Sequence, residues 1–215
     1  MPTLDTILKS HSFYPPIWYG ISNRLLFPGL SPYAYLEALF ATSAQIIQWR
    51  EKDISRDENA LYVKEGVRLA RLSGKVFLVN SDVELALETG ADGVHLTSSQ
   101  EVNSLSKVVG SQSTRRLLLG QSVHSAASAH ISQQLGCDYL LLGPVFDPLS
   151  KKAYTTPLGL KTLQRVVQGS SIPVFALGGL DESRAEEAFA SGAVGVAGIS
   201  WIRHELEAIV GRSSL

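Results

Sequence analysis

The amino-acid sequence predicts an α/β protein built as a single (β/α)₈ TIM barrel. Short runs rich in apolar and β-branched residues recur along the chain, and they are continuous rather than alternating, which is typical of parallel strands covered on both faces. A doubly wound sheet would give the same pattern, and the presence of eight runs favours the barrel. The expected strands lie at residues 17–22, 45–50, 75–79, 92–96, 117–121, 138–143, 173–177 and 195–199.

Each expected strand is followed by a segment with helical spacing, which a capping or turn residue introduces. These helices are expected to begin near Ser31, Asp57, Asp82, Ser99, Ser125, Gly159, Asp181 and Ser200. A chain of 215 residues leaves each of eight units little beyond one strand, one helix and two short loops. We therefore expect one barrel domain over residues 16–215, with few insertions, after a short N-terminal extension at residues 1–15.

Composition narrows the classes of partner. Hydrophobic residues make up 45% of the chain and charged residues 18%, with a formal net charge of -1, so no basic surface is available to bind a nucleic acid. No apolar run approaches the roughly 18 residues that span a membrane. The single Cys137 cannot form an internal disulfide, and the N-terminal residues lack a basic and apolar leader pattern. We expect a cytoplasmic protein that binds neither nucleic acid nor membrane.

Cationic residues follow two of the expected strands. In a (β/α)₈ barrel the chemistry lies at the C-terminal ends of the strands and in the loops beyond them. Arg50 and Lys52 follow the second strand, and Lys151 follows the sixth. Three cations around one cavity predict a polyanionic ligand such as a diphosphate. The alternative is a solvated surface pair bound to Glu51 or Asp53.

A second anion site is predicted after the last two strands. Gly178 and Gly179 lie at a strand-to-helix turn, where backbone N–H groups can approach an anion, and Ser200 opens the last helix at its positive end. A phosphate in this position is common in (β/α)₈ barrels. The alternative is a tight turn and a simple helix cap. Because the two features are neighbours, we favour the phosphate.

The histidines differ in their expected positions. His95 falls within the fourth strand and is expected to pack inside the barrel or under its rim, whereas His124 lies just past the fifth strand. His124 is therefore the histidine expected at the mouth. Trp201 is read as a packing aromatic that could also border the phosphate.

The order of motifs resembles the superfamily of thiamin phosphate synthases and thiazole tautomerases. The matching segments are QWREKD (48–53), VNSDVELALETGADGVHL (79–96), GQSVHSAASA (120–129), LGCDYLLLGPVFDPLSKK (135–152), PLGL (157–160), IPVFALGGL (172–180) and GAVGVAGIS (192–200). The synthases join hydroxymethylpyrimidine diphosphate to a thiazole phosphate and release pyrophosphate. The resemblance implies that Gly178, Gly179, Ile199 and Ser200 bind the thiazole phosphate. The other substrate-binding residues that we expect are Arg50, Lys52, Asn80, Ser122, Ser150 and Lys151.

The sequence departs from the synthase pattern at the metal site. Ser81 and Gln100 stand where the synthases have two aspartates that bind Mg²⁺, and a hydroxyl and an amide are poor replacements for anionic oxygens. Their neighbours Asp82 and Glu101 are each one residue along, near a helix start, and are expected to point away. Pro148 also replaces a threonine of the synthases.

The tautomerase branch lacks this metal pair and, by resemblance, uses the histidine of SVHS as its acid/base, which is His124 here. Histidine can move a proton near neutral pH without a metal. We therefore predict a metal-independent isomerase, with no cofactor, that acts on a phosphorylated thiazole. The alternatives are a Mg²⁺-dependent thiamin phosphate synthase and a non-catalytic barrel that binds a thiamin precursor. The resemblance is also compatible with a homo-oligomer.

Overall fold

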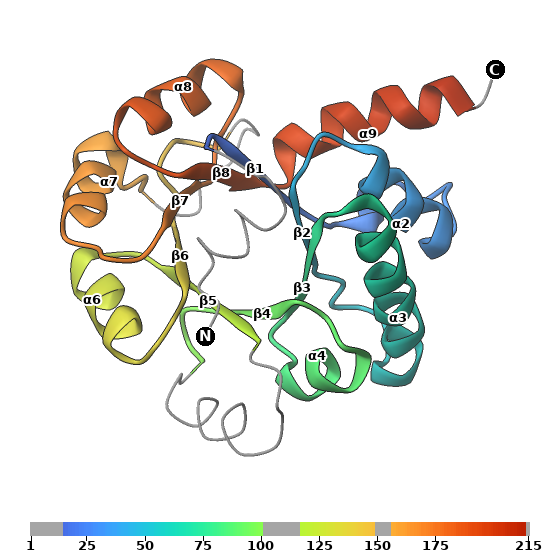
Figure 1. The fold of residues 1–215 in the computed structure, drawn as a ribbon. Helices are drawn as coiled ribbons and strands as arrows, with labels where there is room; N and C mark the ends of the chain where they lie inside the picture. The colour runs from blue at the N-terminus through green and yellow to red at the C-terminus, as the bar shows by residue number, and fades with distance from the viewer. Residues whose placement is uncertain (1–14, 101–116, 149–155, 214–215) are drawn as a thin grey trace.

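The computed structural model describes residues 15–100, 117–148 and 156–213 and shows the closed barrel that the sequence predicts (Figure 1). All eight strands are parallel; each pairs with the next, and β8 closes the ring on β1. The strands are β1 Ile17–Ile21, β2 Ile46–Trp49, β3 Val76–Asn80, β4 Gly93–Leu96, β5 Leu118–Val123, β6 Tyr139–Leu142, β7 Val174–Leu177 and β8 Gly195–Gly198.

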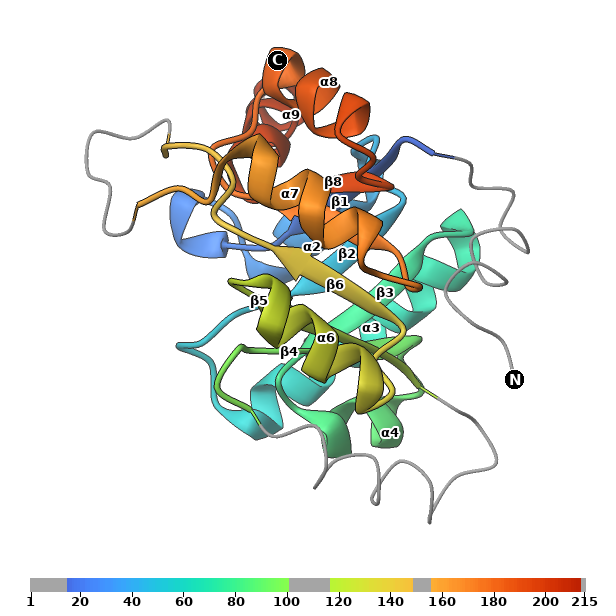
Figure 2. The same ribbon diagram turned by 90° about the vertical axis from the view of Figure 1, so that its left-hand side faces the viewer.

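Helices surround the barrel, and Figure 2 shows α6 and α7 from the side. A short 3₁₀ helix, η1, covers Arg24–Leu26. The α-helices in the described part of the chain are α2 Pro32–Ala41, α3 Arg56–Ser73, α4 Val83–Thr89, α6 Ala126–Gln134, α7 Gly159–Gln168, α8 Glu182–Ala190 and α9 Ser200–Ser213. None of these helices is long and apolar enough to cross a membrane. The helix expected from Ser99 and the extension expected at 1–15 fall largely outside the described residues.

The expected capping residues account for most helix starts. The side chains of Ser31, Asp82, Ser125 and Asp181 each accept a hydrogen bond from a backbone N–H in the first turn of the helix that follows. The capping residue expected at Asp57 was wrong, because α3 already begins at Arg56. The cap is Ser55, whose hydroxyl accepts from Glu58 N, and Asp57 lies in the first turn, where the helix dipole favours a negative charge.

Strand β5 extends further than the sequence indicates. It ends at Val123 rather than at residue 121, because Ser122 and Val123 continue the parallel ladder with β6. The hydroxyl of Ser122 therefore lies on the strand itself, and His124 follows directly at the mouth.

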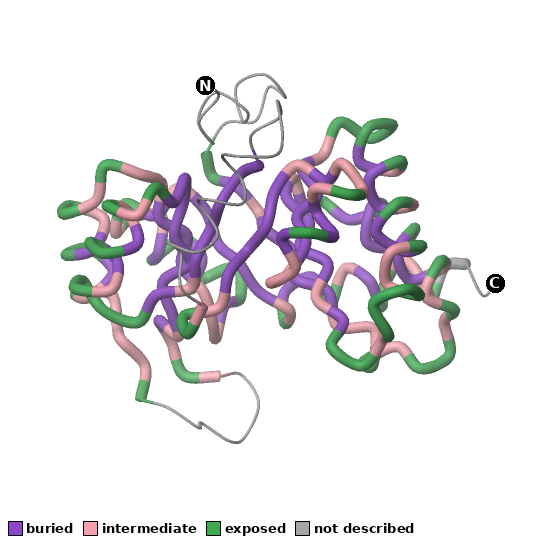
Figure 3. The backbone as a smooth tube through the Cα atoms, turned by 90° about the horizontal axis from the view of Figure 1, so that it is seen from below, coloured by how far each residue is buried: buried purple, intermediate pink, exposed green. Residues whose placement is uncertain are grey.

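The hydrophobic core has two layers. One lies between the strands and the surrounding helices, and the other fills the inside of the barrel around Tyr19, Tyr139 and Phe175. Figure 3 shows the buried strands at the centre of the molecule. Gly120 makes room for the inner layer, because a Cβ atom there would lie 1.9 Å from Tyr139 Cζ. Because the described side chains fill the interior, the cavity between the strands opens at the rim of the barrel.

Candidate active site at the mouth of the barrel

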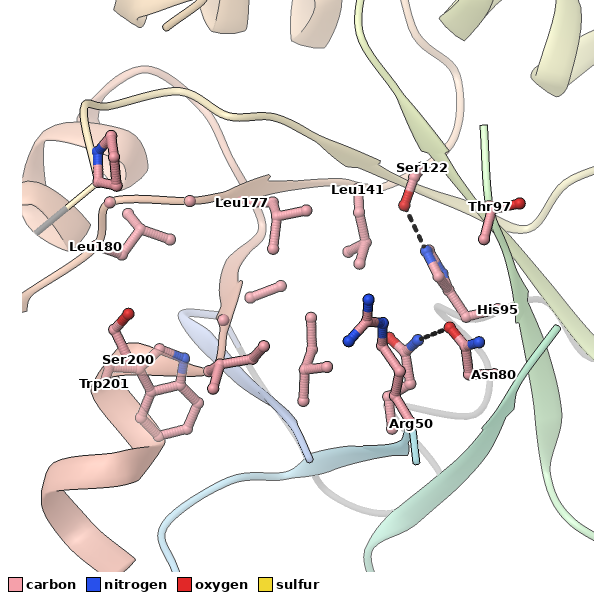
Figure 4. Close-up of a pocket in the computed structure, with 18 of the residues that line it drawn as sticks. Arg50, Asn80, His95, Thr97, Ser122, Leu141, Leu177, Leu180, Ser200 and Trp201 are labelled. Atoms are coloured by element: carbon pink, nitrogen blue, oxygen red, sulfur yellow. Dashed lines mark hydrogen bonds between the residues drawn. The ribbon is translucent and has the colours of Figure 1, made fainter. Parts of the chain in front are cut away.

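A cavity of about 470 Å³ opens at the C-terminal ends of the strands, and all eight strands or the loops after them contribute to its wall. Polar groups line one side, and the glycine turn and the start of α9 line the other (Figure 4). No aspartate or glutamate of the described residues lines this cavity. The polar and charged side chains in its wall are Gln48, Arg50, Asn80, His95, Thr97, Ser98, Ser122, His124 and Ser200.

The floor of the cavity rests on a chain of hydrogen bonds that crosses the barrel interior. Tyr19 OH donates to Gln48 Oε1 at 2.9 Å and lies 3.2 Å from Tyr139 OH. Burial raises the pKa of both phenols, so both keep their protons. Tyr19 uses its single O–H to donate a hydrogen bond to Gln48. In the contact between the two phenols, the Tyr139 hydroxyl must therefore be the donor and Tyr19 the acceptor.

The same reasoning fixes the protons on His95. Tyr139 OH can only accept from His95 Nδ1, at 3.2 Å, so Nδ1 carries the ring proton and Nε2 accepts from Ser122 Oγ at 2.9 Å. His95 is 3% exposed, and burial lowers its pKa to about 3, which keeps the ring neutral. The position of His95 agrees with the sequence expectation.

The other end of this chain of hydrogen bonds reaches the third strand. Gln48 Nε2 donates to Asn80 Oδ1 at 2.9 Å, and Asn80 Nδ2 donates to Ser81 Oγ at 2.9 Å. Every donor therefore points the same way, from Ser122 through the barrel to Ser81. With its proton directed inward, the Ser122 oxygen presents lone pairs to the cavity.

His124 also has a defined tautomer. Its Nδ1 lies 2.5 Å from the carbonyl oxygen of Gly143, and because a carbonyl only accepts, Nδ1 must carry the proton. In the neutral ring Nε2 then bears a lone pair. The side chain is exposed and lines the cavity, so this nitrogen is available to a ligand.

Arg50 lines the cavity without an acidic partner among the described residues. The two nearby carboxylates are engaged elsewhere: Asp53 pairs with the Arg24 guanidinium, and buried Glu51 accepts from Arg24 N at 3.1 and 3.2 Å. Burial raises the pKa of Glu51. Among the described residues, these contacts leave no carboxylate paired with Arg50, whereas Lys52 is exposed and does not line the cavity. The expected residues Ser150 and Lys151 lie outside the described residues.

The glycine turn forms the opposite wall, together with Ile199 and Ser200. Gly178 and Gly179 have φ angles of +93° and +67°, which L-residues rarely adopt. A Cβ atom at Gly179 would come within 2.3 Å of Asp147 O. Only glycine fits here, and Ser200 starts α9 beside it, as expected. We call these four residues the phosphate cup, after the ligand that we expect there from the sequence.

The residues at the synthase metal positions do not fit a magnesium ion held by carboxylates. Gln100 Oε1 accepts a hydrogen bond from Thr97 N at 2.9 Å, and its Nε2 donates to Ser81 O at 3.1 Å. Both ends of the side-chain amide are therefore hydrogen-bonded to the backbone. Asp82 caps α4 and pairs with Arg56 at 3.3 Å. Glu101 lies outside the described residues. Within the described ranges, no cluster of three or more His, Cys, Asp or Glu side chains could hold a metal.

Sequence reasoning missed several residues of this site. Gln48 lies two residues before Arg50, so the period of a strand places both on one face, and this signal was available. Tyr19 and Tyr139 read as ordinary core residues, and nothing in the sequence pairs them.

The fold and the cavity define a (β/α)₈ barrel protein with a small-molecule site at its C-terminal mouth. The chain belongs to the TMP-TENI, or thiamine monophosphate synthase, family, whose model matches residues 19–202. This finding confirms the resemblance of the sequence motifs.

Individual relatives agree with the family assignment. A Geobacter sulfurreducens protein named "Putative thiamine-phosphate synthase" is 36% identical over 185 residues, which cover 86% of this chain and 85% of the relative. The thiamine-phosphate synthase of Pelotomaculum thermopropionicum is 33% identical and covers 81% and 79% of the two chains. The solved structure of a thiamine phosphate pyrophosphorylase from Pyrococcus furiosus matches with a TM-score of 0.73 and 30% identity, over 91% of this chain and 96% of that one.

Proposed function

We propose that this protein is a thiamine-phosphate synthase, a transferase that joins a pyrimidine methyl diphosphate to a thiazole phosphate. The observation that supports the proposal is that Arg50 and the glycine turn with the start of α9 line one cavity, which gives it two walls suited to anions. Arg50 approaches from the end of β2, and the phosphate cup lies across the cavity (Figure 4). Two anion sites suit two phosphorylated substrates, and the names of the relatives support this choice over the isomerase that the sequence motifs alone favoured.

The residues of the chain have distinct roles in this reaction. The phosphate cup holds the thiazole phosphate, and the polar floor at Asn80 and Ser122 faces the pyrimidine. The bond between the methylene carbon and the diphosphate oxygen breaks, the electron pair leaves with the diphosphate, and the thiazole nitrogen forms the new bond to carbon. Arg50 stabilises the charge that develops on the leaving diphosphate. Because the residues do not fit a carboxylate-held Mg²⁺, we derive no step through a metal.

A second candidate is the thiazole tautomerase, and the geometry of His124 favours it. The contact with Gly143 fixes the tautomer and leaves Nε2 able to take a proton from one position of a ring. The proton then returns at the exocyclic carbon, which yields the aromatic thiazole. This reaction needs one phosphate anchor and no diphosphate site.

One experiment distinguishes the two reactions. Purified protein is assayed for condensation of hydroxymethylpyrimidine diphosphate with aromatic thiazole phosphate, with Mg²⁺ and with a chelator, and for isomerisation of the non-aromatic thiazole carboxylate phosphate. The synthase proposal expects condensation, which is strongly slowed in Arg50→Gln. If only isomerisation occurs, and His124→Gln abolishes it, the second candidate is correct. If the protein binds thiazole phosphate but turns over neither substrate set, it is a binding protein and both proposals fail.

A further inference from the structure

The indole of Trp201 carries a buried donor that has no acceptor in the described part of the chain. Trp201 is 7% exposed and its ring packs edge-on against Trp18, with centroids 5.0 Å apart. Among the residues that the structure describes, none accepts a hydrogen bond from Trp201 Nε1. By contrast, Trp49 Nε1 donates to Asn59 Oδ1 at 2.7 Å. A buried N–H without a partner is unfavourable and calls for an explanation.

This donor lies beside the phosphate cup. Trp201 and Gly198 both line the cavity, and a Cβ atom built at Gly198 would lie 3.6 Å from Trp201 Nε1. Figure 4 shows the ring nitrogen on the side of the indole that faces the cavity. A side-chain donor therefore lies directly behind the wall of the cup, in addition to the backbone N–H groups of the glycine turn and α9.

We infer that Trp201 is a specificity-determining residue of the cup, whose indole N–H donates to an oxygen of the bound phosphate. The inference rests on the proposed function, because it assumes that the cup takes a phosphate. An indole N–H can only donate, so it favours an unprotonated oxygen, as a phosphate monoester dianion offers. Because Nε1 is covered, the acceptor reaches it only after a small shift of the ring or of the Gly198–Ser200 backbone.

The test follows the indole N–H signals directly. Protein labelled with ¹⁵N is titrated with inorganic phosphate, and the three tryptophan indole signals are assigned with Trp201→Phe and Trp18→Phe. Trp201→Phe keeps one aromatic ring and removes the part of the indole that carries the donor, and Trp18→Phe makes the same loss of ring size on the neighbouring tryptophan as the matched control. We expect the Trp201 signal to move downfield as phosphate binds, while the signal of Trp49, already bonded, stays in place.

Affinity gives the second measurement. Trp201→Phe is expected to bind phosphate about tenfold more weakly, as for a lost hydrogen bond to a charged group, and Trp18→Phe to bind like the wild type. Equal affinities of Trp201→Phe and wild type, or a Trp201 signal that does not move during saturation, overturn the inference and leave the cup intact. Absence of phosphate binding by the wild type overturns both the cup and the inference. If Trp201→Phe does not fold, the wild-type signal decides alone.

Discussion

Ser122 Oγ donates to His95 Nε2 across 2.9 Å, at the point where the cavity meets the barrel interior. This contact joins a residue of the mouth to a chain of neutral groups that ends at the third strand. The proton positions in this row of hydrogen bonds depend on one another. Each hydroxyl has one proton to donate, so the direction of one hydrogen bond fixes the direction of the next. The floor of the cavity therefore offers fixed acceptors and donors to a ligand before it binds.

The neutrality of His95 predicts acid sensitivity. Its pKa in the folded protein is about 3, against 6.5 for the exposed ring, so the unfolded chain binds a proton at a pH where the folded protein does not. Stability from this group is present above pH 6.5 and is lost as the pH falls towards 3. Between pH 7 and pH 5 the free energy of unfolding should fall by about 2 kcal/mol because of His95. Urea unfolding of wild type and His95→Gln at both pH values measures this share; an equal fall in the two proteins contradicts it.

Removal of the Tyr139 hydroxyl should show how much the interior chain of hydrogen bonds contributes to stability. Tyr139→Phe leaves His95 Nδ1–H without its acceptor inside the barrel, which should lower the free energy of unfolding by about 1–3 kcal/mol. Tyr62→Phe is a suitable control, since among the described residues that hydroxyl donates to the exposed Glu58 and not to the interior network. Urea denaturation of both variants measures the difference, and equal stabilities would mean that the interior chain adds nothing.

Features that depend on local sequence pattern could be predicted from the sequence, whereas those that depend on contacts between distant residues could not. The barrel and most helix starts depend on local pattern, so apolar runs and caps such as Asp82 and Asp181 were enough to place them. The turn at Gly178 and Gly179 was likewise expected. The interior chain depends on contacts such as Tyr19 with Tyr139, 120 residues apart, which only the closed ring creates. Arg50 lines the cavity and Lys52 does not. The carboxylates next to them in the sequence, Glu51 and Asp53, are engaged by Arg24, a contact that only the folded structure creates.

Arg50 lines the cavity and has no acidic partner among the described residues, which predicts a selective defect when it is replaced. Arg50→Gln should lower kcat/KM for condensation by about 10²–10³, as for other groups that stabilise charge in the transition state, and should leave isomerisation unaffected. Arg24→Gln is an informative companion, because it breaks the pair with Asp53 and makes that carboxylate available to Arg50. Steady-state kinetics with both substrate sets measure these effects. An undiminished rate in Arg50→Gln would place the diphosphate elsewhere.

The phosphate cup requires glycine for two separable reasons, a positive φ angle and a close approach. Gly179→Ala meets both penalties, since its Cβ would lie 2.3 Å from Asp147 O at a φ of +67°. Gly74→Ala is a matched control, with a φ of +66° and no atom within 4 Å. We expect Gly74→Ala to lose about 1 kcal/mol of stability from backbone strain, and Gly179→Ala to lose more because its Cβ also clashes with Asp147 O. Only Gly179→Ala is expected to lose phosphate affinity, measured by calorimetry. Equal phosphate affinities would show that the turn does not contact the anion.

Gln100 and Ser81 lead to the last prediction, on the metal. The Gln100 amide bridges Thr97 N and Ser81 O, where the resemblance places carboxylates around Mg²⁺ in the synthases. Ser81 has a φ of +66°, and aspartate tolerates this region better than most residues. The double substitution Ser81→Asp and Gln100→Asp should therefore create two anionic oxygens near each other, which repel in the absence of a cation. We expect Mg²⁺ to raise the Tm of the double variant and to leave that of wild type unchanged, with no substrate present. An equal response to Mg²⁺ in the two proteins would show that these positions do not control metal binding.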